Sequence, residues 1–443
     1  MAISRDAMNR RQFGAGLAAS VSLAGPALAQ GAANIVIIGG GPGGATVAGS
    51  LLRADPSLKV TIVEPNKLYT SCFFSNHYIG GFRSIASLTH NYDGLRRLGA
   101  KLASDRAIDV DQGKKIVRLE DGRQLSYDVL VVAPGIDFKF GAIEGYDEKA
   151  SLRMPHAWRG GWQSQALRGR LEAMPDGGLV VIAPPRNPYR CPPGPYERAC
   201  VIANYLKTKK PKSKLVILDP KLSFSKQPVF EEAFRKYYKD IVELHLTNDI
   251  DDMSVVKVDA VSGEVVTKSG ERYMAAVANI IPDQRAGDIA RVAGLTEGDW
   301  CPVRLETFKS AKAEAIYVLG DAAISAEMPK SAFTANNQAK AVVQSILADL
   351  KGVSSPSAHY RNTCWSLLAP DDSVKIGADY APGENKGKRV LVPSGAFVSQ
   401  PGEKPELRRE VYEESLAWYE TLVADVFAKD PRSTKAQRGD GKG

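Results

Sequence analysis

Short runs of apolar, mostly β-branched residues recur along the chain and predict buried strands of parallel sheets. The first run, Ile35–Ile38, ends at a cluster of glycines and precedes a helical segment that begins with small residues. Further predicted strands are Lys59–Val63, Tyr127–Ala133, Gly178–Ala183, Leu215–Leu218 and Ala315–Leu319. Because helical segments separate these runs, the pattern is typical of an α/β fold with parallel sheets.

The glycines after the first strand have the spacing of a dinucleotide-binding loop. In this G-x-G-x-x-G pattern, Gly39 allows the tight turn, Gly41 lets the backbone approach a pyrophosphate, and Gly44 lets the helix lie close to the strand. Phosphates bind at such a helix N-terminus because its N–H groups are unpaired. Glu64 ends the second predicted strand, where an acidic residue binds ribose hydroxyls. Strand, turn, helix and acid together favour dinucleotide binding over a simple glycine turn.

A second α/β unit follows with a different loop. After the strand Gly178–Ala183, the segment Pro184–Pro195 is rich in proline, and proline removes the N–H donors that a phosphate site needs. The next helix is predicted at Tyr196–Thr208. We therefore expect a degenerate dinucleotide-binding domain that no longer binds NAD.

The chain then returns to the first domain. The strand Ala315–Leu319 ends in Gly320-Asp321. This pair resembles the FAD motif of glutathione-reductase-type flavoproteins, in which the aspartate contacts the ribityl and pyrophosphate region. A helix predicted at Ser331–Lys351 would direct its N-terminus at the flavin and favour the anionic reduced ring. The expected fold is thus α/β, with two Rossmann-like domains and a C-terminal α+β domain.

The N-terminal segment is typical of an export signal. Arg10 and Arg11 precede the weakly apolar stretch Gly14–Leu23, and Pro26–Ala29 forms an A-x-A-like cleavage site. Paired arginines predict twin-arginine export and a periplasmic protein. The expected organisation is a signal peptide at 1–29, an FAD-binding domain at 30–150 and 280–353, a degenerate NAD-binding-like domain at 151–279, a C-terminal interface domain at 354–429 and a disordered tail at 430–443.

Charge and composition narrow the function classes. The 443 residues carry a formal charge of +8, spread along the chain without a basic motif that alternates with aromatics. We therefore expect a basic surface and no nucleic-acid binding. Outside the signal, no apolar stretch reaches the roughly 18 residues of a membrane span, so no transmembrane segment is predicted.

The five cysteines are an odd number for an exported protein and form no C-x-x-C pair. The histidines show no ligand spacing with them, so we expect no metal site. Cys200 and Cys301 are interpreted as buried structural thiols. The other three cysteines lie at positions where a reactive thiol is expected. Cys72 follows the ribose-binding strand, Cys191 lies in the proline-rich loop, and Cys364 belongs to the C-terminal segment.

At these cysteines the chain resembles the flavoprotein subunit of flavocytochrome c sulfide dehydrogenase, over essentially the mature chain. The matching motifs are Tyr69-Thr70-Ser71-Cys72, Arg190-Cys191-Pro192-Pro193-Gly194-Pro195-Tyr196-Glu197, Gly298-Asp299-Trp300-Cys301-Pro302 and Asn362-Thr363-Cys364. The resemblance implies a covalent bond from Cys72 to the flavin 8α-methyl carbon. It also implies a redox-active disulfide between Cys191 and Cys364.

The implied reaction is FAD-dependent oxidation of sulfide. Hydrosulfide attacks the disulfide, with Cys191 as the expected target and Cys364 as the released thiolate, because the thiolate is the reactive species in such exchange. Glu197 has either an acid/base or electrostatic role, or that of a solvated glutamate at a helix start. No Cys-x-x-Cys-His haem motif occurs in the 443 residues, so the resemblance implies that the electrons pass to a haem on a separate c-type cytochrome subunit.

Three alternatives share parts of this pattern. A sulfide:quinone oxidoreductase would use the same fold and disulfide chemistry. The export signal disfavours it, as does the lack of a clear amphipathic segment that would anchor the protein to a membrane. An accessory flavoprotein that reactivates a thiosulfate-oxidising complex would carry the same motifs. An NAD(P)H-dependent disulfide reductase is the least favoured, because the second phosphate loop is lost.

Overall fold

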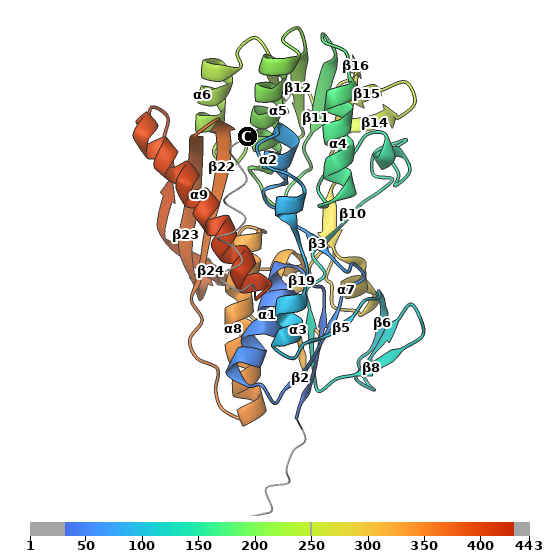
Figure 1. Cartoon of the computed structure of the whole chain (residues 1–443), viewed down its shortest axis with the longest axis vertical. Coiled ribbons are helices and arrows are strands. Elements are labelled where there is room, and N and C mark those ends of the chain that lie inside the picture. Colours follow the sequence, from blue (N-terminus) through green and yellow to red (C-terminus); the bar gives the residue numbers. More distant parts are fainter. Residues whose placement is uncertain (1–31, 249, 429–443) are drawn as a thin grey trace, which may run out of the picture. The chain divides into compact units, whose positions relative to one another are not determined.

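The computed structural model describes residues 32–248 and 250–428, so the predicted signal segment and tail lie outside the described residues. A five-stranded parallel sheet has the order β20-β9-β1-β2-β5. Its strands are β1 (Asn34–Ile38), β2 (Lys59–Val63), β5 (Lys101–Ala103), β9 (Val129–Val132) and β20 (Ile316–Val318). Because β20 pairs with β9, the chain returns to its first sheet after forming a second one. Figure 1 shows the result, with later, orange segments beside the blue N-terminal ones.

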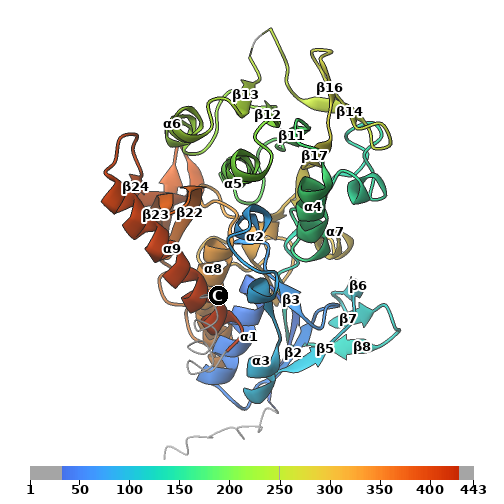
Figure 2. The ribbon, with the colours of Figure 1, turned by 45° about the horizontal axis from the view of Figure 1, so that its top comes forward.

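Helices α1 (Pro42–Ala54) and α8 (Ala332–Lys351) pack together beside this sheet, and α9 (Pro405–Val426) contacts both (Figure 2). Helix α1 buries a face of small and aliphatic side chains, which lets it lie close to the strands. Ser331 caps α8 by accepting a hydrogen bond from Thr334 N at 3.1 Å. Further elements of this region include α3 (Asp93–Arg97), α7 (Asp288–Val292), the antiparallel strands β6 (Ala107–Asp111), β7 (Ile116–Leu119) and β8 (Gln124–Ser126), and the short parallel pair β19 (Cys301–Pro302) and β21 (Ala323–Ile324).

A second parallel sheet has the order β13-β12-β11-β17. Its strands are β11 (Leu179–Ala183), β12 (Lys214–Asp219), β13 (Val242–Leu246) and β17 (Val277–Ile280). The antiparallel strands β14 (Val255–Asp259), β15 (Glu264–Thr267) and β16 (Arg272–Met274) adjoin it, with helices α4 (Trp162–Ala173), α5 (Gly194–Lys209) and α6 (Gln227–Tyr237). Strands β10 (Ile136–Phe138) and β18 (Gln284–Ala286) pair where the chain passes between the two sheets.

The C-terminal region is an antiparallel sheet of three long strands, β22 (Tyr360–Ala369), β23 (Asp372–Asn385) and β24 (Lys388–Val398). Helix α9 packs on β23. Strand β22 contacts both α5 of the second sheet region and α8 of the first. Residues of β22 therefore lie where the three regions meet.

The predicted fold class, with two dinucleotide-type sheets and a C-terminal α+β region, is confirmed. The domain boundaries stay a prediction. The stretch after Glu64 contains β3 (Tyr69–Thr70), paired with β4 (Thr89–His90), and helix α2 (Ser75–Gly80). Six residues are too few to show a helical period, and α2 is stabilised by packing against α4 and α5. Within residues 32–248 and 250–428, no helix combines the length and apolarity that crossing a bilayer requires.

Candidate active site

The turn after β1 leaves no room for side chains at two of its glycines. A Cβ at Gly39 would lie 2.2 Å from Ala133 O, and one at Gly44 would lie 2.0 Å from Gly39 O. Gly39 also has a φ of 103°, which favours glycine. Gly41 is the N-cap of α1 and has no side chain to accept a bond from the first helical N–H groups. The loop therefore has the geometry that an anion site at a helix N-terminus requires.

Glu64 lies beside this loop at the carboxyl end of β2. Its Oε2 accepts a hydrogen bond from Gly40 N at 3.0 Å, and its Oε1 accepts one from Asn66 N at 3.0 Å. The residue is 9% exposed. The carboxylate is thus held at the edge of the glycine loop, and its contact with ribose stays a prediction.

Two buried polar atoms without partners lie at the Gly320-Asp321 turn. Among the described residues, Asp321 Oδ1 and Gln338 Nε2 have no hydrogen-bond partner, while Gln338 Oε1 accepts from Gly320 N at 2.8 Å. Burial raises the pKa of Asp321, and the guanidinium of Arg190, with Nη1 3.6 Å from Asp321 Oδ2, opposes that shift. Orphaned buried polar atoms are costly. The turn therefore fits a bound polar group such as the ribityl and pyrophosphate part of FAD.

Cys72 lies near Cys191 and near Tyr69, the tyrosine beside the glycine loop. It follows β3 and is half-buried. The Cys72 thiol is close enough to interact electrostatically with Tyr69, Arg190 and Cys191. Tyr69 in turn lies 3.6 Å from where a Cβ of Gly41 would be. The structure thus places Cys72 beside the predicted cofactor site, and its covalent bond to flavin stays a prediction.

Cys191 is held in an unusual backbone conformation by its loop. Its φ is 58°, its N donates to Lys330 O at 2.8 Å, and its carbonyl accepts from Gly194 N at 2.8 Å. A Cβ at Gly194 would lie 3.0 Å from Cys191 Sγ and 2.8 Å from the Trp158 ring. The glycine of the Cys-Pro-Pro-Gly run therefore leaves space for the sulfur.

Cys364 comes to the same place from β22. Its Sγ lies 3.5 Å from Asn362 Nδ2, and it interacts electrostatically with Cys191. Both residues are free thiols in the structure, and burial raises the pKa of each. The packing of β22 against α5 thus brings the two predicted redox cysteines together, whereas the disulfide between them stays a prediction. Cys200 and Cys301 are fully buried, as predicted.

Glu197 points into this cluster from the first turn of α5. Its Oε2 accepts from Asn76 Nδ2 at 2.7 Å, and its Oε1 accepts from Leu367 N at 2.9 Å. Burial raises the pKa of this carboxyl, and the two hydrogen bonds oppose the shift. The side chain is 14% exposed. The interpretation of Glu197 as a solvated helix-start residue is therefore wrong.

A cavity of about 660 Å³ reaches Cys364. Its lining includes side chains from the proline-rich loop and from β22, β23 and β24, among them Pro192, Pro193, Asn362, Tyr380 and Phe397. Because Cys364 belongs to this lining, a small solute can approach its sulfur from this side.

Sequence reasoning missed three side chains of the cluster. Arg190 precedes Cys191 in a motif that the sequence already singled out, so its position was a usable signal. His77 Nε2 lies 4.0 Å from Glu197 Oε1, and burial lowers the pKa of His77 to about 3. Lys226 donates to the carbonyl oxygen of Cys364 at 3.2 Å. Neither His77 nor Lys226 belongs to a local pattern that indicates a site.

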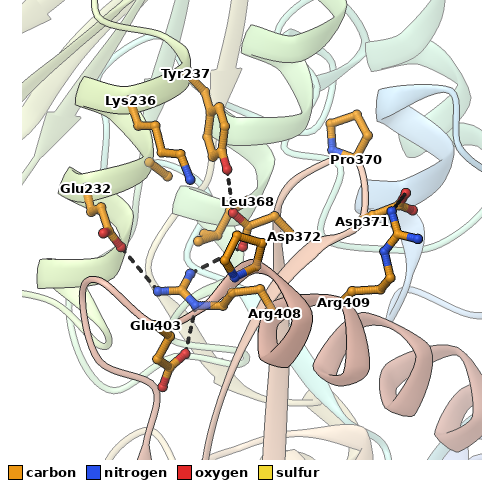
Figure 3. Close-up of a pocket in the computed structure, with 12 residues that line it drawn as sticks. Glu232, Lys236, Tyr237, Leu368, Pro370, Asp371, Asp372, Glu403, Arg408 and Arg409 are labelled. Atoms are coloured by element: carbon orange, nitrogen blue, oxygen red, sulfur yellow. Dashed lines mark hydrogen bonds and ion pairs between the residues drawn. The ribbon is translucent and has the colours of Figure 1, made fainter.

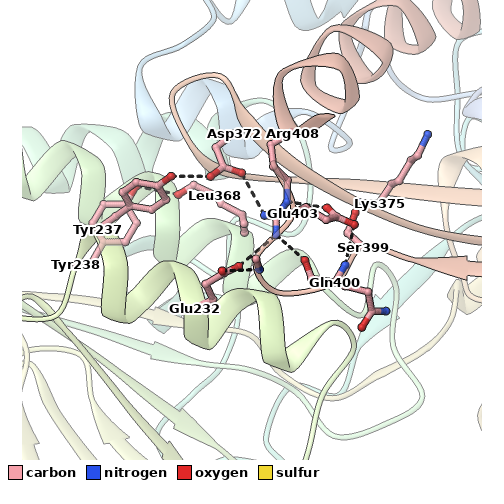
Figure 4. A network of polar contacts seen from close by, with 11 residues as sticks. Glu232, Tyr237, Tyr238, Leu368, Asp372, Lys375, Ser399, Gln400, Glu403 and Arg408 are labelled. Atoms are coloured by element: carbon pink, nitrogen blue, oxygen red, sulfur yellow. Dashed lines mark hydrogen bonds and ion pairs between the residues drawn. The ribbon is translucent and has the colours of Figure 1, made fainter. Parts of the chain in front are cut away.

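A second buried polar cluster surrounds Arg408 on α9, beside a cavity of about 180 Å³ (Figure 3). Its guanidinium donates from Nε to Glu403 at 2.7 Å, from Nη1 to Asp372 at 3.3 Å and from Nη2 to Glu232 at 3.2 Å (Figure 4). The cluster joins α6, the start of β23 and α9. In the part of the chain that the structure describes, neither this cluster nor any other group of His, Cys, Asp and Glu forms a metal site.

Three family models match parts of the chain. Residues 33–171 match pyridine nucleotide-disulphide oxidoreductases. Residues 164–282 match the central part of the sulfide dehydrogenase [flavocytochrome c] flavoprotein chain, and residues 356–427 match the flavin-binding part of flavocytochrome c sulphide dehydrogenase. A sulfide dehydrogenase flavoprotein chain of Chlorobaculum thiosulfatiphilum is 48% identical over 46 residues, which are 10% of this chain and 96% of that sequence.

The chain belongs to the flavocytochrome c sulfide dehydrogenase flavoprotein family. The two models specific to this family contain Cys191 and Glu197 on one side and Cys364 on the other, whereas the general model contains the glycine loop and Cys72. Family membership and the unpartnered atoms at Asp321 together support FAD as the bound cofactor.

More distant relatives share the fold. The mouse mitochondrial sulfide:quinone oxidoreductase is 21% identical over 299 residues, and this match spans 65% of each chain. The crystal structure of the sulfide:quinone oxidoreductase of Aquifex aeolicus superposes with a TM-score of 0.66 at 17% identity, over 93% of this chain and 96% of that one. The structural likeness supports the two-domain FAD-type fold.

Proposed function

We propose that this chain is a periplasmic, FAD-dependent sulfide dehydrogenase that passes electrons to a c-type cytochrome subunit. One observation carries the proposal: Cys364 on β22 meets Cys191 and Glu197, which belong to a single segment at the start of α5, in one buried cluster beside Cys72 and Arg190. Two cysteines together with a buried carboxyl are suited to thiol–disulfide exchange. The family match supplies sulfide as the substrate class.

The first step is attack of hydrosulfide on a Cys191–Cys364 disulfide. A new S–S bond forms between hydrosulfide and Cys191, the old S–S bond breaks, and its electron pair leaves with Cys364 as the thiolate. Glu197, whose pKa is raised by burial, would accept the proton of the resulting persulfide. Bound FAD supplies the two-electron acceptor for this oxidation.

The glycine loop, Glu64 and Asp321 would hold the cofactor in this scheme. Cys72 would attach it covalently, which fixes its position relative to Cys191. Acid precipitation tests the attachment: flavin should remain with the protein in the native chain and be released from the Cys72→Ala variant. Release of all flavin from the native chain would refute the covalent bond and leave non-covalent FAD binding intact.

The central experiment is an anaerobic titration of the flavin-loaded protein with sulfide, with NADH as a control. We expect sulfide to bleach the flavin absorbance and NADH to leave it unchanged, because the proline-rich loop replaces the nicotinamide phosphate site. No bleaching by sulfide would overturn the dehydrogenase and favour the accessory role in thiosulfate oxidation.

The electron acceptor needs a separate assay. Reduction of a c-type cytochrome, but not of a short-chain quinone, is expected after sulfide addition. The likeness to sulfide:quinone oxidoreductases makes the quinone reaction the second candidate. If the quinone is reduced faster than the cytochrome, the acceptor is a quinone. The proposed sulfide chemistry would then be unchanged.

The proposed compartment rests on the N-terminal signal. Expression of the complete chain, with a variant in which Arg10 and Arg11 are replaced by lysine, tests it. We expect the native chain in the periplasmic fraction and the variant in the cytoplasm. Equal distribution of the two forms would refute twin-arginine export.

A further inference from the structure

Lys226 is a buried lysine that joins the loop before α6 to the strand that carries Cys364. Its Nζ donates to Cys364 O at 3.2 Å and to Ser366 Oγ at 2.8 Å. The residue is 5% exposed. Its backbone is left-handed, with a φ of 63°, a conformation that is unfavourable for a lysine. Both backbone and side chain are therefore constrained to this position.

The ammonium group of Lys226 has no carboxylate to balance it at close range. Among the described residues, its hydrogen bonds go to a carbonyl and a hydroxyl, and no carboxylate lies within ion-pair distance of it. Three acidic groups face it: Cys364 on β22, Glu197 on α5 and Cys191 in the proline-rich loop. Burial lowers the pKa of Lys226 to about 8, and these three groups oppose the shift. A buried ammonium without a close anion is costly, unless an anion forms beside it during the reaction.

We propose that Lys226 is a positioning residue that stabilises the Cys364 sulfur as a thiolate when the Cys191–Cys364 bond is broken. This inference rests on the proposed function and adds a charge partner for the leaving sulfur. Hydrosulfide brings one negative charge, which ends on Cys364 after the exchange, so the charge appears beside the ammonium. A leaving thiol of lower pKa leaves faster, and the lysine therefore accelerates the attack on Cys191.

The other groups around Cys364 do not replace this charge. Hydrogen bonds from Asn362 and Ser331 also lower the pKa of the thiol, but both side chains are neutral. Glu197 raises the pKa of Cys364, as does burial. Tyr380 on β23 also faces Cys364; burial raises the pKa of that phenol, and the thiolate raises it further. Among these neighbours of Cys364, Lys226 is therefore the group whose positive charge stabilises the thiolate.

The test measures alkylation of Cys364 across pH in the reduced, flavin-loaded protein. Iodoacetamide is the probe, and mass spectrometry separates Cys364 from the other cysteines. In Lys226→Met, the alkylation rate at pH 7, where the lysine of the native chain is charged, should fall about tenfold. Lys226→Arg should restore the native profile because it keeps the charge.

Ser366→Ala is the matched control, since it removes one hydrogen bond of Nζ and keeps the ammonium. Its profile should stay close to that of the native chain. Lys226→Gln, which retains hydrogen bonding without the charge, provides a second neutral variant if Lys226→Met does not fold. An unchanged Cys364 profile in a folded neutral variant would overturn the inference.

Alkylation does not require sulfide, so the two proposals fail separately. If sulfide does not reduce the flavin of the native protein, but the neutral variant shifts the Cys364 profile, the dehydrogenase reaction is refuted and the role of Lys226 at the thiol stands. If sulfide reduces the flavin and the profile does not shift, the reaction stands and Lys226 is only structural.

Discussion

Two buried polar clusters involve α6, one through its N-cap Lys226 and the other through Glu232, and they are built differently. Around Arg408, one guanidinium binds three carboxylates, and each carboxylate has a second partner: Glu232 accepts from Gly402 N, Glu403 from Gln400 N and Asp372 from Tyr237. Around the cysteines, Lys226 has no paired carboxylate, and the pKa of Glu197 is raised by burial. His77 Nδ1 has no partner among the described residues.

From this difference we infer that the charged groups around Arg408 stabilise the fold, whereas those around the cysteines take part in the reaction. A network whose donors and acceptors are all matched has little to gain from a ligand, and it holds its elements in place. A cluster with unmatched groups keeps a cost that a substrate or reaction step can relieve. Changes at the cysteine cluster should therefore alter activity, and changes around Arg408 should alter stability.

The largest effect should follow loss of either redox cysteine. In Cys191→Ser or Cys364→Ser, the rate of flavin reduction by sulfide should fall at least about 10³-fold, because the sulfur-exchange step is lost. Stopped-flow absorbance measures it. Cys301→Ala, at a buried cysteine outside the cluster, should retain the native rate. Retention of sulfide-driven reduction in both serine variants would show that the cysteine pair is not the reacting centre.

Arg408→Met should leave three carboxylates without their cation. We expect the free energy of unfolding to fall by about 3 kcal/mol, because breaking a buried ion pair from one side leaves uncompensated charge. Arg409→Met is the control: Arg409 and its partner Asp371 are 64% and 55% exposed, so its effect should stay below about 1 kcal/mol. Urea unfolding compares them. Similar losses of unfolding free energy in Arg408→Met and Arg409→Met would refute a structural role specific to Arg408.

Glu197 predicts a pH-dependent difference in stability. Its folded pKa is raised above the ordinary value of 4.5, so the folded state binds more protons in this range, and stability falls as pH rises from 4.5 through the raised pKa. Glu197→Gln should remove this fall. The stability advantage of the variant should grow from pH 4.5 upward and then level off. Denaturant unfolding at a series of pH values measures this advantage. A difference in unfolding free energy between variant and native chain that stays constant with pH would contradict the raised pKa of Glu197.

The smallest effect should come from the edge of the Arg408 cluster. Tyr237 donates its hydroxyl to Asp372 at 2.7 Å. Tyr237→Phe removes this bond but leaves the guanidinium on Asp372, so we expect a loss of about 1 kcal/mol in unfolding free energy. Sulfide-driven flavin reduction should be unchanged. A loss as large as that of Arg408→Met would mean that the cluster depends on the tyrosine as much as on the arginine.

The sequence alone determined the features that depend on neighbours in the chain. The glycine loop could be predicted because a turn, a close approach and a helix start each need a particular residue at a short spacing. The buried strands could be predicted from apolar runs, and the family from the Cys-Pro-Pro-Gly-Pro-Tyr-Glu run. The burial of Glu197 could not be predicted, because it depends on Asn76 and Leu367, which come from other elements.

Only the tertiary structure decided which distant groups meet. Lys226 follows β12 and Cys364 lies on β22, and no local period relates them. Arg408 reaches Asp372 because α9 packs on β23, and it reaches Glu232 on α6, which is also distant in the sequence. The physical reason is range: turn geometry and hydrophobic period act within a few residues, whereas a buried charge finds its partners only when the packed sheets bring them within hydrogen-bonding distance.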